Sequence, residues 1–123
     1  DLKHFKPFND RFGHQVGDAV LCLVAKRIRM QIRSGDLAAR VGGDEFVVLL
    51  DGLTEAQRLQ DSAISIGESL CQPFSILGIQ GAIDVSIGGA MSPRDGASEE
   101  ELLAVADSNM YRAKQSGERY YIP

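Results

Sequence analysis

Two adjacent carboxylates, Asp44 and Glu45, directly follow the glycine pair Gly42-Gly43. The flanking stretches 37–41 and 46–50 are mostly apolar and too short for typical helices, so we expect two strands joined by a tight glycine turn. Glycine permits positive φ angles and leaves room beside the backbone for a bulky ligand. Hard oxygen ligands at such an exposed tip suit Mg²⁺ that bridges nucleotide phosphates. An ordinary Gly-Gly turn with solvated acids is the alternative for this pentapeptide taken alone.

The composition of the chain fits one folded domain. It has 123 residues, of which 44% are hydrophobic and 24% charged, with a net charge of -4. Binding a nucleic-acid backbone without metal usually requires a surplus of Lys and Arg, so this balance argues against a nucleic-acid partner. No apolar run is long enough to cross a bilayer. Cys22 and Cys71 lack zinc-site spacing, and we expect two buried, reduced thiols in a cytoplasmic protein or in the cytoplasmic part of a membrane-anchored one.

Apolar periodicity and capping patterns predict three helices. Apolar side chains recur at every fourth position over 16–32, which is typical of an amphipathic helix. Thr54 and Ser98 each open a capping-box pattern. These patterns predict a helix over 54–72 and another that runs from Ser98 to a C-cap at Gly117.

Short stretches rich in β-formers separate the predicted helices. Residues 74–76 and the alternating segment 85–91 flank a glycine turn at 78–81, which predicts a hairpin with one buried face. A last strand over 119–122 is expected to close the sheet. This order of elements indicates an α/β or α+β sandwich, with helices packed on a central sheet.

Three longer motifs carry a resemblance to a known family. The first runs from Asp1 to Asp18 and contains an acid, a Phe-Lys pair, an Asn-Asp pair and Gly-His…Gly-Asp in this order. The second spans 40–46, and the third runs from Asp107 to Gly117. Together they resemble, in register over the whole chain, the GGDEF domain of bacterial diguanylate cyclases. The resemblance implies one domain over residues 1–123 with an α+β, palm-like nucleotidyl-cyclase fold around a mostly antiparallel sheet.

The resemblance also implies a reaction and a metal. Domains of this family condense two GTP into cyclic di-GMP with release of pyrophosphate, and they use Mg²⁺ or Mn²⁺. The implied metal ligands are the carboxylates of Asp1, Asp44 and Glu45 and the backbone carbonyl of Leu2. Glu45 would also help to deprotonate the attacking 3′-hydroxyl, a role that a carboxylate can play when a metal lowers the pKa of the hydroxyl.

Further positions match residues that hold the nucleotide. Lys6 and Lys114 match lysines that neutralise the triphosphate, although a lone lysine is usually a solvated helix residue. Asn9 and Asp18 match residues that grip guanine and so prefer GTP over ATP, and both are also plausible helix caps. The implied substrate-binding set is completed by four residues: Gly42, Gly43, His4 and Phe5.

Arg33 and Asp36 lie where the family carries an Arg-x-x-Asp site that binds cyclic di-GMP as an inhibitory product. An arginine offers a bidentate fork to a phosphate or guanine, and an aspartate accepts from the Watson-Crick edge of guanine. A helix-ending arginine followed by a turn aspartate is the alternative.

The symmetry of the product bears on assembly. Cyclic di-GMP is two-fold symmetric and has two phosphodiester bonds, so each of two domains is expected to bring one GTP to a homodimer with facing active sites. In the parent protein, the resemblance implies an attached sensor domain, and a phosphodiesterase domain is a further candidate.

Three departures from the family pattern qualify these expectations. The family has a further helix and strand before the acid matched by Asp1, so the domain is expected to be N-terminally incomplete. Lys3 stands where a second acid is usual, and a cation so near the metal pocket would weaken ion binding. Glu118 replaces a basic residue. A second function therefore stays open: a non-catalytic GGDEF-like module that binds GTP or cyclic di-GMP and regulates an attached domain.

Overall fold

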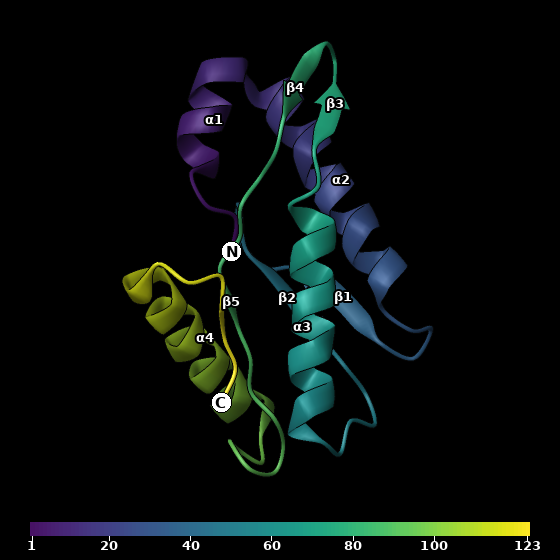
Figure 1. Ribbon diagram of the computed structural model, residues 1–123, viewed down its shortest axis with the longest axis vertical. Helices are drawn as coiled ribbons and strands as arrows, with labels where there is room; N and C mark the ends of the chain where they lie inside the picture. Colours follow the sequence, from purple (N-terminus) through teal and green to yellow (C-terminus); the bar gives the residue numbers. More distant parts are fainter.

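The computed structural model describes residues 1–123 and contains four helices and three two-stranded sheets (Figure 1). The helices are α1 (Phe5–Phe12), α2 (His14–Gln31), α3 (Ala56–Leu70) and α4 (Glu99–Ser116). The strands are β1 (Leu37–Arg40), β2 (Phe46–Leu49), β3 (Phe74–Ile76), β4 (Ile79–Gly81), β5 (Ile87–Gly88) and β6 (Tyr120–Tyr121). The predicted α+β class is confirmed.

No helix of the chain combines the length and the apolar character needed to cross a membrane.

The sheets are short, and the first residues of the chain connect two of them. β1 pairs antiparallel with β2, β3 pairs antiparallel with β4, and β5 pairs parallel with β6. The Leu2 N–H donates to the Asp44 carbonyl at 3.0 Å, and Leu2 forms an antiparallel bridge with Val85. Residues 1–3 thus lie between the β1–β2 turn and the segment that leads into β5, near the middle of the molecule (Figure 1).

The core forms where α2 and α3 pack together against Leu2 and Val85. The buried side of α2 confirms the periodicity of the sequence, because Val20, Val24 and Ile28 are almost completely buried. α3 adds Ala63, Ile66 and Leu70 from one face. Burial of each such side chain stabilises the fold by roughly 1.5–3 kcal/mol, so this contact fixes the orientation of α2, which carries Asp18.

Helix boundaries agree only in part with the capping patterns. Ser98 accepts the Glu101 N–H at 3.1 Å, and Gly117 adopts a left-handed φ of 73°, so both predicted caps of α4 are confirmed. The predicted Thr54 cap is wrong: α3 begins at Ala56 after Glu55, whose side chain makes no capping hydrogen bond. The helix α1 was not predicted, because Pro7 obscured it, yet proline is tolerated in a first turn.

The predicted hairpin of 74–76 with 85–91 is wrong in its second strand. Leu77 and Gly78 have φ values of 49° and 80°, and β3 therefore turns back at once into β4. Two central residues with positive φ form the type of turn that closes a hairpin with a two-residue loop. The 85–91 segment therefore does not pair with β3. Val85 instead forms a bridge with Leu2, and β5 pairs with β6.

The prediction of two buried thiols is also wrong, since Cys22 is exposed and Cys71 is half-buried. Both cysteines are free.

Candidate functional site

The turn between β1 and β2 presents Asp44 and Glu45 at the end of a closed hairpin. The Val41 N–H donates to the Glu45 carbonyl at 3.0 Å, and Arg40 Nε donates to the Gly42 carbonyl at 3.0 Å. Neither Gly42 nor Gly43 has a positive φ, so this turn does not use the left-handed conformation that glycine permits. A side chain at Gly43 would meet no atom within 4 Å. Gly43 therefore borders open space, whereas a Cβ at Gly42 would contact the Glu45 side chain at 3.6 Å.

The start of the chain lies directly beside this turn. The hydrogen bond from Leu2 to the Asp44 carbonyl fixes the turn to residues 1–3, while no backbone N–H reaches the Leu2 carbonyl. This hydrogen bond holds Asp44 and Glu45, the two turn carboxylates, beside the segment that carries Asp1.

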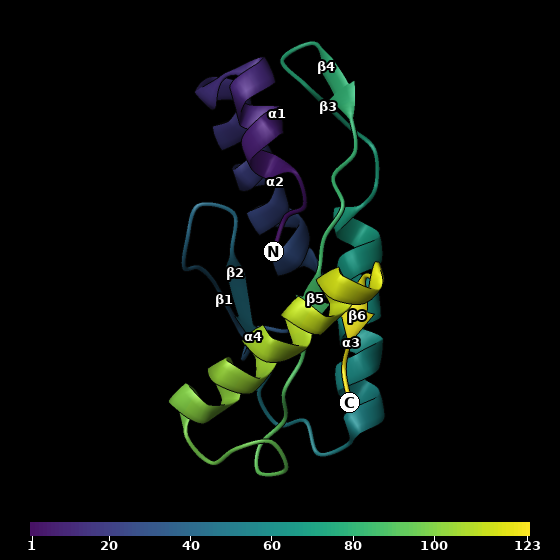
Figure 2. The same cartoon turned by 90° about the vertical axis from the view of Figure 1, so that its left-hand side faces the viewer.

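α4 brings a cation to the same place. Lys114 forms an ion pair with the Asp1 carboxylate, whose side chain is only 8% exposed, against 40% for Lys114. α4 can approach because it lies across β5 and β6 (Figure 2), and Gly88 leaves no side chain between the helix and the strand. Residues from the first segment and from α4 therefore meet at the candidate site.

The donors gathered here suit a hard cation by their chemistry. Asp1, Asp44 and Glu45 offer carboxylate oxygens, and Leu2 offers a free carbonyl oxygen, which are ligands that Mg²⁺ accepts. The Lys114 ammonium group already shows that the Asp1 carboxylate accommodates a positive charge. The structure contains no group of three His, Cys, Asp or Glu side chains close enough to hold a metal ion. The predicted metal ligands stay a prediction.

The predicted guanine-binding residues lie where α1 meets α2. Asn9 Nδ2 lies 2.8 Å from His14 Nδ1, and Asp18 is exposed on α2 immediately after Gly17. The Phe5 ring also borders Gly17, at 3.4 Å from the position of an ideal Cβ there. The structure thus brings Asn9 and Phe5 together beside Gly17, with Asp18 next to it in sequence.

The remaining predicted nucleotide contacts, His4 and Lys6, are exposed at the start of α1. His4 precedes the helix with a left-handed φ of 57°. Such a conformation is uncommon for a residue with a side chain and marks a sharp change of chain direction between the Asp1 segment and α1.

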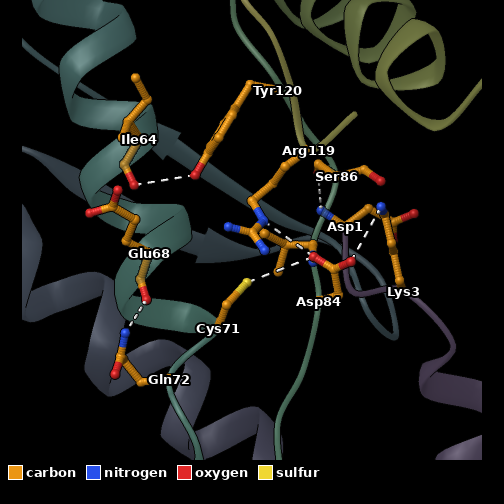
Figure 3. A network of polar contacts seen from close by, with 11 residues as sticks. Asp1, Lys3, Ile64, Glu68, Cys71, Gln72, Asp84, Ser86, Arg119 and Tyr120 are labelled. Atoms are coloured by element: carbon orange, nitrogen blue, oxygen red, sulfur yellow. Dashed lines mark hydrogen bonds and ion pairs between the residues drawn. The ribbon is translucent and has the colours of Figure 1, made fainter. Parts of the chain in front are cut away.

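Lys3, a departure from the family pattern, has a partner. Its Nζ lies 3.5 Å from Asp84 Oδ2, and Arg119 Nε donates to Asp84 Oδ1 at 3.2 Å (Figure 3). Partial burial alone would raise the pKa of Asp84, but the Val85 N–H and the two cations outweigh it and lower this pKa. Asp84 therefore offsets part of the Lys3 charge, because the same carboxylate also pairs with Arg119. Sequence reasoning missed Asp84, because 81 residues separate it from Lys3.

The predicted product-binding pair is tied into its own loop. Asp36, with a side chain 2% exposed, accepts the backbone N–H groups of Arg33 and Asp51, each at 2.9 Å. These hydrogen bonds, with that from Asp51 the strongest, lower the pKa of Asp36. The Arg33 side chain is 61% exposed and also donates to the Asp51 carbonyl. Asp36 thus braces the loop, and binding of a product by this pair stays a prediction.

Comparison with known sequences finds a family model that matches nearly the whole chain. The family model "Diguanylate cyclase, GGDEF domain" matches residues 1–120. The bifunctional diguanylate cyclase/cyclic di-GMP phosphodiesterase MucR of Pseudomonas aeruginosa is 42% identical over 98% of this chain, which spans 18% of MucR. Diguanylate cyclase TpbB of the same species is 42% identical over 94% of this chain and 27% of TpbB. The chain thus spans about a fifth to a quarter of these two relatives.

Solved structures agree with the sequence comparison. The GGDEF domain of TpbB from Pseudomonas aeruginosa superposes with a TM-score of 0.92 at 39% identity, covering 98% of this chain and 78% of that one. The GGDEF domain of DgcB from Caulobacter crescentus, solved in complex with c-di-GMP, gives a TM-score of 0.86 at 31% identity over 98% of this chain and 71% of that one. On these grounds, the chain belongs to the GGDEF domain family, whose named members include diguanylate cyclases and other proteins of cyclic di-GMP signalling.

Proposed function

We propose that this domain condenses two GTP into cyclic di-GMP with release of pyrophosphate. The observation that carries the proposal is that the Asp1–Lys114 ion pair lies beside the Asp44-Glu45 turn, although these residues come from three distant parts of the sequence. Carboxylates for a cation and a lysine for a phosphate are the groups that phosphoryl-type transfer requires.

Oxygen donors of this site would hold Mg²⁺ or Mn²⁺, namely Asp1, the Leu2 carbonyl, Asp44 and Glu45. When bound, the ion would neutralise phosphate oxygens and lower the pKa of the attacking 3′-hydroxyl. Glu45 accepts the proton of that hydroxyl. Lys114 donates to the phosphate oxygens, and Lys6 adds charge from α1.

Each condensation forms one bond and breaks one. The 3′-oxygen of one GTP attacks the α-phosphorus of the other, the bond from that phosphorus to the bridging oxygen of the β-phosphate breaks, and pyrophosphate leaves with the electron pair. A second, symmetric attack closes the ring. Both substrates must be held face to face, so we infer that two copies of the domain act as a homodimer.

One observation favours a second candidate, a non-catalytic module that binds GTP or cyclic di-GMP. Asp1 is nearly buried and already paired with Lys114, and Lys3 adds a cation two residues away. A site that keeps this ion pair on binding would hold a nucleotide without assembling the metal ligands.

The test is turnover of GTP by the full-length protein that contains this chain, with Mg²⁺ present. We expect cyclic di-GMP and pyrophosphate at a 1:2 ratio, with product lost in Glu45→Gln, which keeps the size of the side chain but removes the base. Tight GTP or cyclic di-GMP binding without product would instead support the non-catalytic module. Absence of both binding and product would refute both.

A further inference from the structure

The side-chain amide of Asn9 lies between His14 and Gly17, and its two ends have different surroundings. Its Nδ2 lies 2.8 Å from His14 Nδ1. Its Oδ1 is buried and has no hydrogen-bond partner. An ideal Cβ on Gly17 would lie only 2.0 Å from this oxygen. The carbonyl end therefore packs directly against the backbone of Gly17, in space that any other residue would fill.

These neighbours select one of two orientations of the amide. The oxygen and the NH₂ group are similar in size, so a half-turn of the amide is sterically inexpensive and hydrogen bonding must decide. With the ring proton on Nε2, His14 Nδ1 accepts a hydrogen bond from the NH₂ group. The reverse orientation would bury the NH₂ group against Gly17 without an acceptor, and buried N–H groups lacking a partner are rarer than carbonyl oxygens lacking one.

The selected orientation has a consequence for recognition of a base. One N–H of the Asn9 amide is engaged by His14, and the other stays available as a donor. Guanine carries an acceptor, O6, at the position where adenine carries the donor N6 amine. A fixed donor favours guanine and opposes adenine, whereas a reversed amide would present an acceptor and weaken this preference.

We propose that His14 is a specificity-determining positioning residue, which holds the Asn9 amide so that its NH₂ group faces the base, while Gly17 makes room for the carbonyl end. This rests on the proposed function in one respect, namely that Asn9 binds the guanine of GTP. His14 itself does not touch the base, and it acts through Asn9.

The first test compares GTP and ATP binding by the full-length protein and its variants. His14→Phe keeps an aromatic ring but removes the acceptor, and His14→Gln restores an acceptor oxygen. Gln15→Phe adds the same ring at the neighbouring exposed position and serves as the matched control. We expect His14→Phe to lower the preference for GTP over ATP by about tenfold, the value of roughly one hydrogen bond, while His14→Gln and Gln15→Phe keep most of it. An unchanged preference in His14→Phe would overturn the proposal.

A second measurement reports on the amide without any nucleotide. In ¹⁵N-labelled protein, the side-chain NH₂ resonance of Asn9 is identified by its loss in Asn9→Asp. We expect this resonance to shift in His14→Phe and in Gly17→Ala, whose methyl group would displace Oδ1, but not in Gln15→Phe. An Asn9 resonance whose chemical shift does not change in His14→Phe would refute the positioning role. If the wild type binds no GTP while the resonance moves as expected, the proposed function fails but the orienting role of His14 stands.

Discussion

At the scale of single residues, the site depends on how each charge is partnered. Asp1 is paired with Lys114, Lys3 with Asp84, and Asp36 with the N–H groups of its own loop. Lys114 belongs to the third motif, but the motifs do not indicate that it pairs with Asp1, and Asp84 and the backbone N–H groups lie outside the motifs. Asp44 and Glu45 could be singled out as candidate site residues from the sequence, whereas the groups that pair with Asp1, Lys3 and Asp36 were found only in the three-dimensional structure.

Asp84 is expected to protect the metal pocket from the charge of Lys3. Asp84→Asn leaves the Lys3 ammonium group without its carboxylate partner, two residues from Asp1, and so should raise the Mg²⁺ concentration needed for half-maximal activity about fivefold, or ~1 kcal/mol. Removing the cation as well, in Asp84→Asn with Lys3→Met, should restore the wild-type value. A double variant as weak as the single one would show that Asp84 acts through Arg119 or Cys71 instead.

Asp36 should make stability depend on pH in the acidic range. Its pKa is lowered in the folded state, so its contribution is fully present above the unfolded-state value of about 3.9 and is lost as the pH falls through the lower folded value. Asp36→Asn should therefore lower the melting temperature at pH 7, and the difference from wild type should shrink below about pH 4. Asp107→Asn, at an exposed acid, is the control. A difference that stays constant with pH would contradict an ionic role.

At the scale of elements, the hairpin turn, α2 and both caps of α4 were predictable because each rests on local sequence. The pairing of β1 with β2 was predicted with the turn, but the other pairings were not, since β5 pairs with β6 across more than thirty residues and Val85 meets Leu2 across the chain. The turn at Leu77-Gly78 was overlooked because leucine rarely adopts a positive φ. The tertiary contacts that bring Lys114 and Asp1 together could therefore not be predicted from local sequence.

Arg27 should stabilise the packing of α2 on α3. It donates to the carbonyls of Leu70, Gln72 and Pro73 at 3.2, 2.7 and 3.0 Å, at the end of α3. Arg27→Met keeps the apolar stem but leaves these acceptors to water, and we expect a loss of about 1–3 kcal/mol in the free energy of unfolding. Arg29→Met, at an exposed position on the same helix, should change it by less than about 0.5 kcal/mol. Equal losses in chemical denaturation would argue against the capping role.

A side chain at Gly88 should disturb the packing of α4 on β5. An ideal Cβ there would lie 2.2 Å from the Ala106 carbonyl oxygen and from the Met110 nitrogen, both in the helix backbone. Gly88→Ala must push α4 off β5, so we expect a loss of about 1–3 kcal/mol in unfolding free energy, together with reduced turnover because Lys114 moves with the helix. Gly35→Ala, where a Cβ would meet nothing, is the control for unfolding. Wild-type stability in Gly88→Ala would refute this packing.

At the scale of the whole molecule, the fold class and the family were predictable from the order of three motifs, and the structure confirms both. The motifs specify types of residue along the chain. They do not specify that three short sheets, rather than one continuous sheet, support the site.

The proposed homodimer makes activity depend on protein concentration. Two facing domains are needed for each product, so specific activity should rise with concentration until the dimer is saturated. Excess Glu45→Gln protein mixed with wild type should suppress product formation, because mixed dimers carry one defective site. Specific activity that is independent of concentration down to nanomolar protein, with no suppression on mixing, would contradict the facing-site arrangement unless the dimer is permanent, which sedimentation would reveal.

The ion pair between Asp1 and Lys114 joins residues that are separated by 113 positions. Closing so long a loop costs conformational entropy and requires the intervening chain to be present. Synthesis proceeds from the N-terminus at about 5–20 residues per second. Lys114 is therefore made several seconds after Asp1, and the ion pair cannot form before then. A nascent chain can therefore complete its hairpin turn and the contact of α2 with α3 on the ribosome, but the charge balance of the site is established only after α4 has emerged.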